Sequence, residues 1–288
     1  MELGSRLRKT QRNQRSRTAW LAGLLACFFG CLAAGVASEG PAADASLSAA
    51  VCPIVYQLDQ TPASRGYRYS FFGNGFFINE EGYILTVAHV LETFRDGGQP
   101  YVLVTRPDSP PQLLRADVIA VDKEHDVAIL RATPNPFVGK HRVVYLALAS
   151  GPAAVGQHVI AVSLHPQKPQ NAQSFQAPQE DHSSGEVVSY ESTQLEKSAP
   201  AADVFLLSHP VTLGQSGSPV LATDSQSVVG LVEGRWLRSS GISLAKSSAQ
   251  SASVPGAAIP IRYAIALLQR QSVSWHAPQS SPNAAPAR

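Results

Sequence analysis

The sequence predicts an all-β protein, a barrel or a sandwich, in which two halves with the same rhythm of strands follow one another. Short β-branched and aromatic runs, bounded by turn residues, recur at intervals of about 8–12 residues. The chain has 21 glycines and 21 prolines among 288 residues, which favours strands and loops over long helices. A connection over 132–153 that contains proline and glycine separates the two halves.

The strands expected in the first half are short and apolar or aromatic. They cover residues 51–56, 67–78, 83–87, 101–105, 116–121 and 127–130. The second half repeats the rhythm over residues 159–163, 185–190, 204–207, 220–221, 227–232 and 257–259. Two further segments are expected to be loops because they are rich in glutamine and proline or in serine and alanine, namely 165–184 and 237–254.

One helix is expected near the end of the chain. Pro260 suits the first turn of a helix. Apolar residues then follow at the spacing of one helix face: Ile261, Ala264, Ile265 and Leu268. Residues 272–288 are rich in serine, proline and alanine, which predicts a disordered tail.

Residues 1–38 have the composition of an export signal. Residues 1–17 carry six basic side chains and one acidic one, and 19–37 carry no charge. A basic arm, an apolar run and small residues in this order are typical of a signal peptide. The apolar run also has the length of a membrane-spanning helix, so an uncleaved anchor is an alternative, and a lipoprotein-type cleavage at Cys27 is a weaker one. Either way, the linker 39–47 and the rest of the chain are expected in the periplasm or outside the cell.

Charge and cysteine content exclude several classes of function. The whole chain has a formal charge of +2 and residues 1–37 contribute +5, so the remainder carries −3. The exported part is therefore not expected to bind nucleic acid. Cys52 is its only cysteine, which excludes an intrachain disulfide there. No group of histidines and cysteines at ligand spacing predicts a metal site, and no other cofactor is expected.

The segment 214–219 (GQSGSP) is a turn that presents Ser216 between two glycines. Glycine permits unusual dihedrals and lets backbone N–H groups point beside the serine oxygen. His89 follows one strand-like run and Asp126 precedes another, and each alone is an ordinary strand-end or turn residue. Together, a histidine can take the proton of a serine, and an aspartate can fix the tautomer of that histidine. The order His, Asp, Ser is that of chymotrypsin-like enzymes.

Five segments, in the same order, resemble trypsin-like serine proteases of the HtrA/DegP type. They are 73–90 around His89, 125–130 around Asp126, 184–189, 214–219 around Ser216, and 256–261. The resemblance covers residues 48–271. It implies two six-stranded antiparallel β-barrels and a C-terminal helix, with barrel one over about 48–145, barrel two over about 150–260 and the helix over 261–271. Because the sequence ends soon after this helix, a PDZ domain is not expected.

The resemblance also implies an activity and assigns roles to residues. The chain would be a serine endopeptidase that hydrolyses polypeptides through an acyl-enzyme on Ser216, with His89 as general base and Asp126 orienting it. The backbone N–H groups of Gly214 and Ser216 would form the oxyanion hole. No aspartate lies at the base of the substrate pocket, which favours small or medium apolar side chains. The pocket wall would include Pro210, Leu231, Val232 and Glu233.

One departure from the family pattern leaves other functions open. Ser218 stands where the family usually has a second glycine, so the backbone beside the oxyanion hole can differ. A catalytically silent protease fold that serves as a binding module is therefore an alternative to the endopeptidase. An esterase-like hydrolase is a third hypothesis, but the G-x-S-x-G pattern lacks its second glycine and its strand–helix context.

Overall fold

The computed structural model describes nine segments of the chain, all after residue 46. They are residues 47–58, 68–92, 98–106, 109–138, 143–167, 176–196, 199–237, 241–243 and 254–278. The predicted signal or anchor over 1–38 lies outside these residues, as does nearly all of the linker over 39–47. Within the described segments, no helix is both long enough and apolar enough to cross a membrane.

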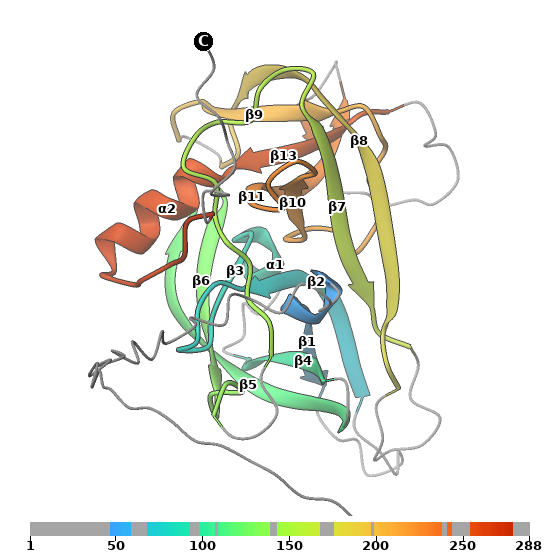
Figure 1. Ribbon diagram of the computed structural model, residues 1–288, viewed down its shortest axis with the longest axis vertical. Helices are drawn as coiled ribbons and strands as arrows, with labels where there is room; N and C mark the ends of the chain where they lie inside the picture. Colours follow the sequence, from blue (N-terminus) through green and yellow to red (C-terminus); the bar gives the residue numbers. More distant parts are fainter. Residues whose placement is uncertain are drawn as a thin grey trace, which may run out of the picture. The chain divides into compact units, whose positions relative to one another are not determined.

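The first half of the chain forms a closed antiparallel barrel (Figure 1). Its strands adjoin in the order β1-β2-β3-β6-β5-β4, and β1 pairs with β4 to close the ring. The strands are β1 (Val51–Leu58), β2 (Arg68–Phe77), β3 (Tyr83–Thr86), β4 (Pro100–Arg106), β5 (Ser109–Asp122) and β6 (Val127–Thr133). β-Branched and aromatic side chains suit the packed face of such strands, and the fully buried ones include Ile54, Phe76, Ile84, Val102 and Ile129.

The second half forms a second antiparallel sheet. Its strands adjoin in the order β10-β7-β8-β9-β13-β11-β12, and an additional β10–β11 pairing closes six of them into a ring. The strands are β7 (His158–His165), β8 (Gln179–Thr193), β9 (Ala202–Leu207), β10 (Pro219–Ala222), β11 (Val228–Leu237), β12 (Gly241–Ser243) and β13 (Gly256–Pro260). The predicted fold class, an all-β protein with two six-stranded barrels, is confirmed, and β12 is an extra strand that pairs only with β11.

The predicted C-terminal helix is present as α2 (Ile261–Arg270), with Pro260 as its N-cap residue. It packs against β6 of the first barrel and against β11 and β13 of the second. Ile261, Ala264 and Leu268 are buried as expected, but Leu267 is buried as well. Two short helices complete the described fold, the 3₁₀ helix η1 (Leu47–Ala50) and α1 (His89–Glu92).

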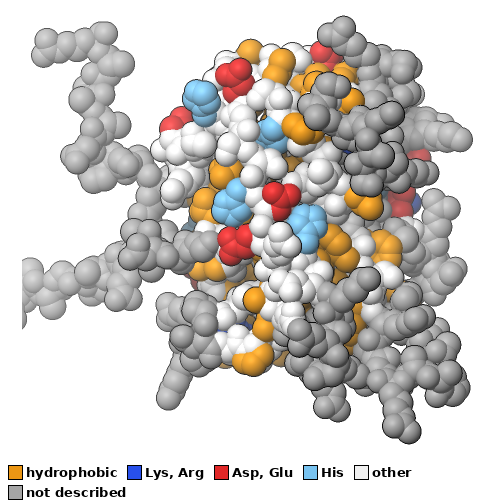
Figure 2. Space-filling model, turned by 90° about the vertical axis from the view of Figure 1, so that its right-hand side faces the viewer, with side chains coloured by type: hydrophobic (Ala, Val, Ile, Leu, Met, Phe, Trp, Pro, Cys, Tyr) orange, Lys and Arg blue, Asp and Glu red, His pale blue; other side chains and the backbone are white. Residues whose placement is uncertain are grey.

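The predicted loop over 165–184 is wrong in its second part, because β8 begins at Gln179. β8 pairs with β7 along its first eight residues, yet most of its side chains remain exposed or half-buried on both faces. A strand that is solvated on both faces carries no apolar alternation, so its sequence resembles that of a loop. Figure 2 views the molecule from the side on which Figure 1 shows β7 and β8. On this face, acidic and histidine side chains lie near one another, and Lys and Arg side chains are sparse.

The predicted disordered tail over 272–288 is wrong for residues 272–278. Val273 is buried, and the carbonyl oxygens of Ser274 and His276 accept hydrogen bonds from the Asn79 side chain and the Leu148 backbone. The His276 ring also stacks on Tyr145. These contacts come from isolated residues without a periodic pattern, so the composition of the segment did not reveal them. Residues 279–288 lie outside the described part of the chain.

Candidate active site

His89 lies directly after β3, as the first residue of α1. The preceding apolar residues, Val87 and Ala88, are buried in the first barrel, and the Ala88 N–H donates to the Asp126 carbonyl at 3.2 Å. Because β3 pairs with β6, the end of β3 and the turn before β6 lie side by side. The sheet register thus brings His89 next to Asp126, although 37 residues separate them in sequence.

Asp126 holds His89 at two points. Its Oδ1 accepts a hydrogen bond from the His89 backbone N–H at 2.8 Å, and its Oδ2 lies 2.7 Å from Nδ1 of the His89 ring. Asp126 adopts a left-handed backbone conformation with φ 53°, which Asp tolerates better than most residues. The contact fixes a proton on Nδ1 and leaves Nε2 as the basic nitrogen. The two residues therefore form the pair that the sequence predicted.

The pKa of His89 is raised to about 9. Burial alone would lower it, because burial disfavours the charged imidazolium. The charge and hydrogen bond of Asp126 outweigh burial, and the carboxyl groups of Glu233 and Glu92 add to the effect. The site thus favours the protonated ring more strongly than water does.

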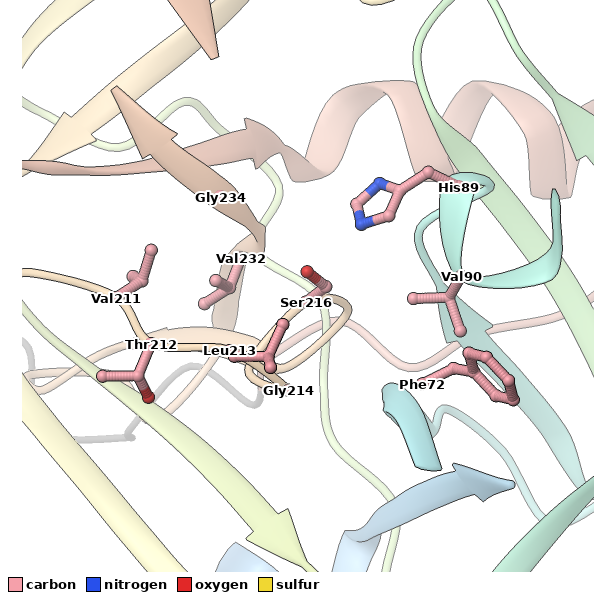
Figure 3. A pocket seen from close by; sticks show the side chains of 10 residues that line it. All are labelled: Phe72, His89, Val90, Val211, Thr212, Leu213, Gly214, Ser216, Val232 and Gly234. Carbon is pink, nitrogen blue, oxygen red and sulfur yellow. The ribbon is translucent and has the colours of Figure 1, made fainter. Parts of the chain in front are cut away.

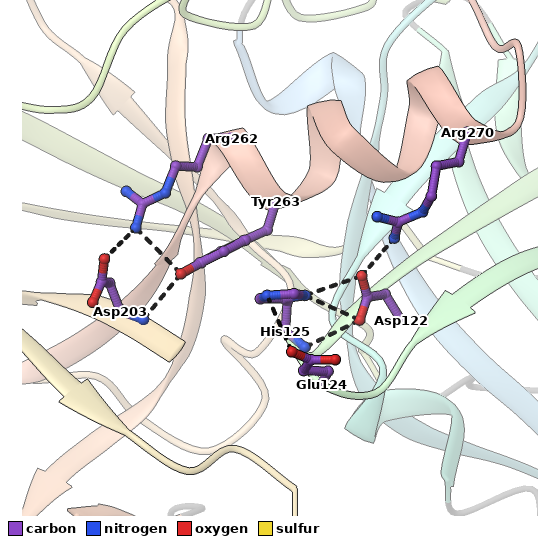
Figure 4. A network of polar contacts seen from close by, with 7 residues as sticks. All are labelled: Asp122, Glu124, His125, Asp203, Arg262, Tyr263 and Arg270. Carbon is purple, nitrogen blue, oxygen red and sulfur yellow. Dashed lines mark hydrogen bonds and ion pairs between the residues drawn. The ribbon is translucent and has the colours of Figure 1, made fainter. Parts of the chain in front are cut away.

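A polar network fixes the turn that precedes Asp126 (Figure 4). The His125 ring contacts the Asp122 carboxylate at 3.1 Å and stacks on the Tyr263 ring at 4.1 Å between centroids. Arg270 donates to the same carboxylate at 2.6 Å. Burial would raise the pKa of Asp122, but the hydrogen bonds from His125 and Arg270 lower it overall. Two residues of α2 thereby anchor the turn that carries Asp126.

Ser216 lies in the turn before β10, on the second barrel. Gly214 and Gly217 have φ angles of 93° and 79°, a region that favours glycine. A Cβ at Gly217 would also collide with the backbone oxygen of Asn74. The two glycines on either side of Ser216 are therefore required by backbone conformation, and at Gly217 also by close packing against the first barrel.

Gln215 anchors the Ser216 turn within the second barrel. Its side chain is buried, and its Oε1 accepts a hydrogen bond from the Thr212 N–H at 2.7 Å. Its Nε2 donates to Asp181 of β8 at 3.0 Å. Gln215 thus connects the Ser216 turn to β8.

Asn74 connects this turn to the first barrel, a role that the sequence patterns did not indicate. Its Nδ2 donates to the Gly214 carbonyl at 2.8 Å, and its Oδ1 accepts from the Leu164 N–H at 3.1 Å. Its own N–H donates to the Ser216 carbonyl at 2.8 Å. Asn74 is fully buried. Buried polar side chains are hydrogen-bonded, so a polar residue at the centre of the strand-like run 67–78 was the one feature of the sequence that could have indicated this role.

Ser216 and His89 face the same cavity but are not hydrogen-bonded to each other (Figure 3). The Ser216 hydroxyl donates to the Glu233 carbonyl at 3.1 Å, and Nε2 of His89 is buried without a partner in the described structure. No hydrogen bond of the described residues uses the N–H of Gly214 or Ser216.

The Ser218 side chain is buried beside the Ser216 turn. The residue has no exposed surface, and its Oγ is buried without a partner among the described residues. Its N–H donates to the Gln215 carbonyl and its carbonyl accepts from the Val232 N–H. The side chain of Ser218 is thus accommodated inside the loop, at the position where the family usually has a glycine.

Ser218→Ala is expected to leave stability unchanged or to raise the free energy of unfolding by up to about 1 kcal/mol, because it removes an unpaired buried hydroxyl. Thermal unfolding of the variant beside the wild type measures this. A loss of more than about 1 kcal/mol would show that the hydroxyl has a partner.

The cavity beside Ser216 has a volume of about 130 Å³ and mainly apolar walls. Of the four predicted wall residues, only Val232 lines it, together with Phe72, Val90, Val211, Thr212, Leu213, Gly214 and Gly234. Pro210 and Leu231 are not among the lining residues. Glu233 lies at an irregularity in the pairing of β11 with β13, and it lines a second cavity that His89 also lines.

Glu233 places a second carboxyl group beside the His89–Asp126 pair. Its Oε1 lies 3.9 Å from Nδ1 of His89, and its Oε2 is buried without a partner in the described structure. Burial raises the pKa of Glu233, the nearby charge of Asp126 raises it further, and His89 opposes both. The sequence predicted Glu233 only as part of the pocket wall. Its position beside His89 depends on where β11 lies relative to the first barrel, which the sequence alone does not reveal.

His89, Asp126 and Glu233 also form the one group in the described residues with metal-ligand atoms close together, all within 4.8 Å. Tetrahedral ligands at bond lengths of about 2.0 Å lie about 3.3 Å apart. The 2.7 Å contact between Nδ1 and Oδ2 is shorter than that. The geometry therefore fits a shared proton better than a metal ion.

Comparison with known proteins gives both a family and a fold. The family of trypsin-like peptidase domains matches residues 73–231, more than half of the chain. A probable periplasmic serine endoprotease DegP-like from Halomonas elongata is 35% identical over 77 residues, which make up 26% of this chain and 15% of that protein.

Solved structures share the fold at low sequence identity. The crystal structure of Deg5 matches with a TM-score of 0.52 and 17% identity, over 76% of this chain and 87% of that one. The HtrA-type protease AlgW with a decapeptide matches with a TM-score of 0.51 and 16% identity, over 78% of this chain and 65% of that one.

Proposed function

The chain belongs to the family of trypsin-like peptidase domains, and from this premise we propose that it is a serine endopeptidase. The observation that carries the proposal is the double hold of Asp126 on His89, at 2.8 Å to the backbone N–H and 2.7 Å to Nδ1. This arrangement leaves Nε2 free, on the side of the cavity where Ser216 lies.

In the proposed reaction, Nε2 of His89 takes the proton of the Ser216 hydroxyl while Oγ attacks a peptide carbonyl. Asp126 stabilises the imidazolium that forms. The N–H groups of Gly214 and Ser216 donate to the developing oxyanion. His89 then gives its proton to the leaving amine, and the same base activates the water that hydrolyses the ester on Ser216.

Polypeptides are the proposed substrates. The structure of the HtrA-type protease AlgW with a decapeptide supports this class, because that protein shares the fold. The 130 Å³ cavity with its apolar walls suits a small or medium apolar side chain at the residue whose carbonyl is attacked. The export pattern of residues 1–38 and the periplasmic name of the Halomonas relative support a periplasmic or extracellular site of action.

A catalytically silent binding module is the second candidate, and one observation favours it. The Ser216 hydroxyl donates to the Glu233 carbonyl instead of to His89. In the endopeptidase proposal this is a resting arrangement, because hydrogen bonds between catalytic groups often tighten only with substrate. In the silent module it would persist, and Ser216 would never be activated.

Labelling with a fluorophosphonate probe distinguishes the two. Such probes react with a serine that an adjacent base activates. We expect the purified protein to be labelled and the Ser216→Ala variant to remain unlabelled, with both showing the same thermal unfolding. If the folded wild type stays unlabelled between pH 7 and pH 10, the endopeptidase proposal is wrong and the silent module is favoured.

A further inference from the structure

A second cavity of about 200 Å³ lies beside His89, distinct from the apolar cavity at Ser216. His89 lines both cavities, so the two adjoin at its ring. The walls of the second cavity come from the end of β3 and α1, from the turn before β6, from the segment after β8 and from β11. Its lining residues are Ala88, His89, Glu92, Lys123, Asp126, Gln194, Leu195, Glu196 and Glu233.

Carboxyl groups outnumber basic groups in this second cavity. Four carboxyl groups line it, from Glu92, Asp126, Glu196 and Glu233, against the single ammonium group of Lys123. Lys123 lies 3.7 Å from Glu92, so it offsets the charge of that residue. His89 is the remaining titratable group, and it already contacts Asp126.

Glu233 gives an independent sign that the cavity takes a ligand. Glu233 is only 6% exposed, and its Oε2 makes no hydrogen bond in the described structure. A buried carboxyl oxygen without a partner is costly, so such groups call for an explanation. A cationic group inside the cavity would supply the missing partner.

The position of the cavity relates it to a bound peptide. Successive residues of an extended chain advance by about 3.3–3.5 Å, and their side chains point in opposite directions. When the residue under attack places its side chain in the apolar cavity, the residue before it directs its side chain away from that cavity. Because His89 lines both cavities, the acidic cavity adjoins the apolar one, and a side chain that points away from the apolar cavity can enter it.

We propose that the acidic cavity is a subsite for a lysine or arginine side chain, carried by the residue that precedes the one under attack. The proposal rests on the endopeptidase function proposed above. A basic side chain is long enough to place its charge among the carboxyl groups while its methylenes cover Leu195. The positive charge of this side chain would also offset the negative charge that raises the pKa of His89. His89 would then be neutral, and able to act as a base, at lower pH.

A matched series of peptidyl phosphonates tests the subsite by covalent reaction with the full chain. Each probe carries valine phosphonate as the reacting residue, preceded by lysine, norleucine or glutamate. We expect the lysine probe to react at least about tenfold faster than the norleucine probe and the glutamate probe to be the slowest, in low salt. The pH midpoint for the lysine probe should lie below that for norleucine.

Glu196→Gln is the test variant, because Glu196 lines the cavity but is not among the carboxyl groups that raise the pKa of His89. It should reduce the ratio of lysine to norleucine rates by about threefold or more. Glu186→Gln is the control. Glu186 is an exposed residue of β8 that lines neither cavity, so its substitution removes the same charge elsewhere on the surface. The control should keep the wild-type ratio.

The outcomes separate the subsite from the endopeptidase function. If the fluorophosphonate labels Ser216 but lysine and norleucine probes react equally, the subsite is wrong and the endopeptidase stands. If the ratio falls equally in Glu186→Gln and Glu196→Gln, the preference is a general charge effect and the subsite is again wrong. If no probe reacts and the fluorophosphonate does not label, the endopeptidase proposal itself fails.

Discussion

Glu233→Gln is expected to move the pH midpoint of Ser216 acylation downward by at least about half a pH unit. The physical reason is the ionised Glu233 carboxylate, which lies 3.9 Å from Nδ1 of His89 and raises the pKa of that ring. Glutamine has nearly the same shape as glutamate but carries no charge at any of these pH values. The variant therefore removes the charge and leaves the packing of β11 almost unchanged.

The sign of the effect follows from the role of His89. A general base acts in its neutral form, so acylation should rise with pH through the pKa of His89, which is about 9 in the wild type. Lowering that pKa makes more free base available at neutral pH. Fluorophosphonate labelling rates between pH 6 and pH 10 measure both midpoints, and an unchanged midpoint in Glu233→Gln would contradict the coupling.

The same substitution is expected to change how stability depends on pH. His89 has a raised pKa in the folded state, so its contribution is complete below its ordinary value of 6.5 and is lost as the pH rises through about 9. Glu233 also has a raised pKa, so its contribution is present below 4.5 and is lost as the pH rises through the raised value. Wild-type stability should therefore fall between pH 5 and pH 10 more than that of Glu233→Gln.

Thermal unfolding at both pH values measures this difference, with Glu186→Gln as the control for loss of an exposed carboxylate. The control should show the wild-type fall in unfolding temperature. An equal fall in all three proteins would mean that Glu233 is already ionised at pH 5 in the folded state, and would contradict the expected raised pKa.

Local sequence patterns, together with their order along the chain, led to the prediction that His89, Asp126 and Ser216 belong to one site. Glycine around Ser216, an aspartate before β6 and a histidine after β3 each belong to a turn with its own short-range chemistry. Their order along two runs of strands then matched one known architecture. The 2.7 Å contact between His89 and Asp126 follows from the pairing of β3 with β6, which that architecture requires.

The contributions of Glu233 and Asn74 could not be read in the same way. Each lies within a strand, where the sequence predicts only burial or exposure by alternation. Their importance comes from what lies across the cleft: the His89 ring for Glu233, and the Gly214 and Leu164 backbone for Asn74. Such contacts depend on how the two barrels dock, and no spacing within one strand encodes that.

Asn74→Ala is expected to lower the free energy of unfolding by about 2–4 kcal/mol, because it leaves one buried and one half-buried backbone group unpaired. These are the Gly214 carbonyl and the Leu164 N–H, which now bond to the Asn74 side chain at 2.8 and 3.1 Å. They belong to the Ser216 turn and to β7, so the substitution also releases the turn from the first barrel. Thermal and denaturant unfolding measure the loss of stability.

The substitution should also slow fluorophosphonate labelling of the protein that remains folded, by about 10- to 100-fold. In the proposed mechanism the Gly214 and Ser216 N–H groups converge on one oxygen, and displacement of about 1 Å can cost 10²-fold in rate. Rates are measured well below the unfolding temperature of the variant, so that loss of folded protein does not contribute.

Asn79→Ala is the matched control for Asn74→Ala. Asn79 is equally buried, its Nδ2 donates to the Ser274 carbonyl at 2.7 Å, and its Oδ1 accepts from the N–H groups of Glu81 and Tyr83. Its loss should cost comparable stability, since it too leaves backbone groups unpaired. It touches neither Ser216 nor His89, so labelling should stay at the wild-type rate. Equal slowing in both variants would mean that Asn74 supports the fold in general, and that the Ser216 turn does not depend on it for its position.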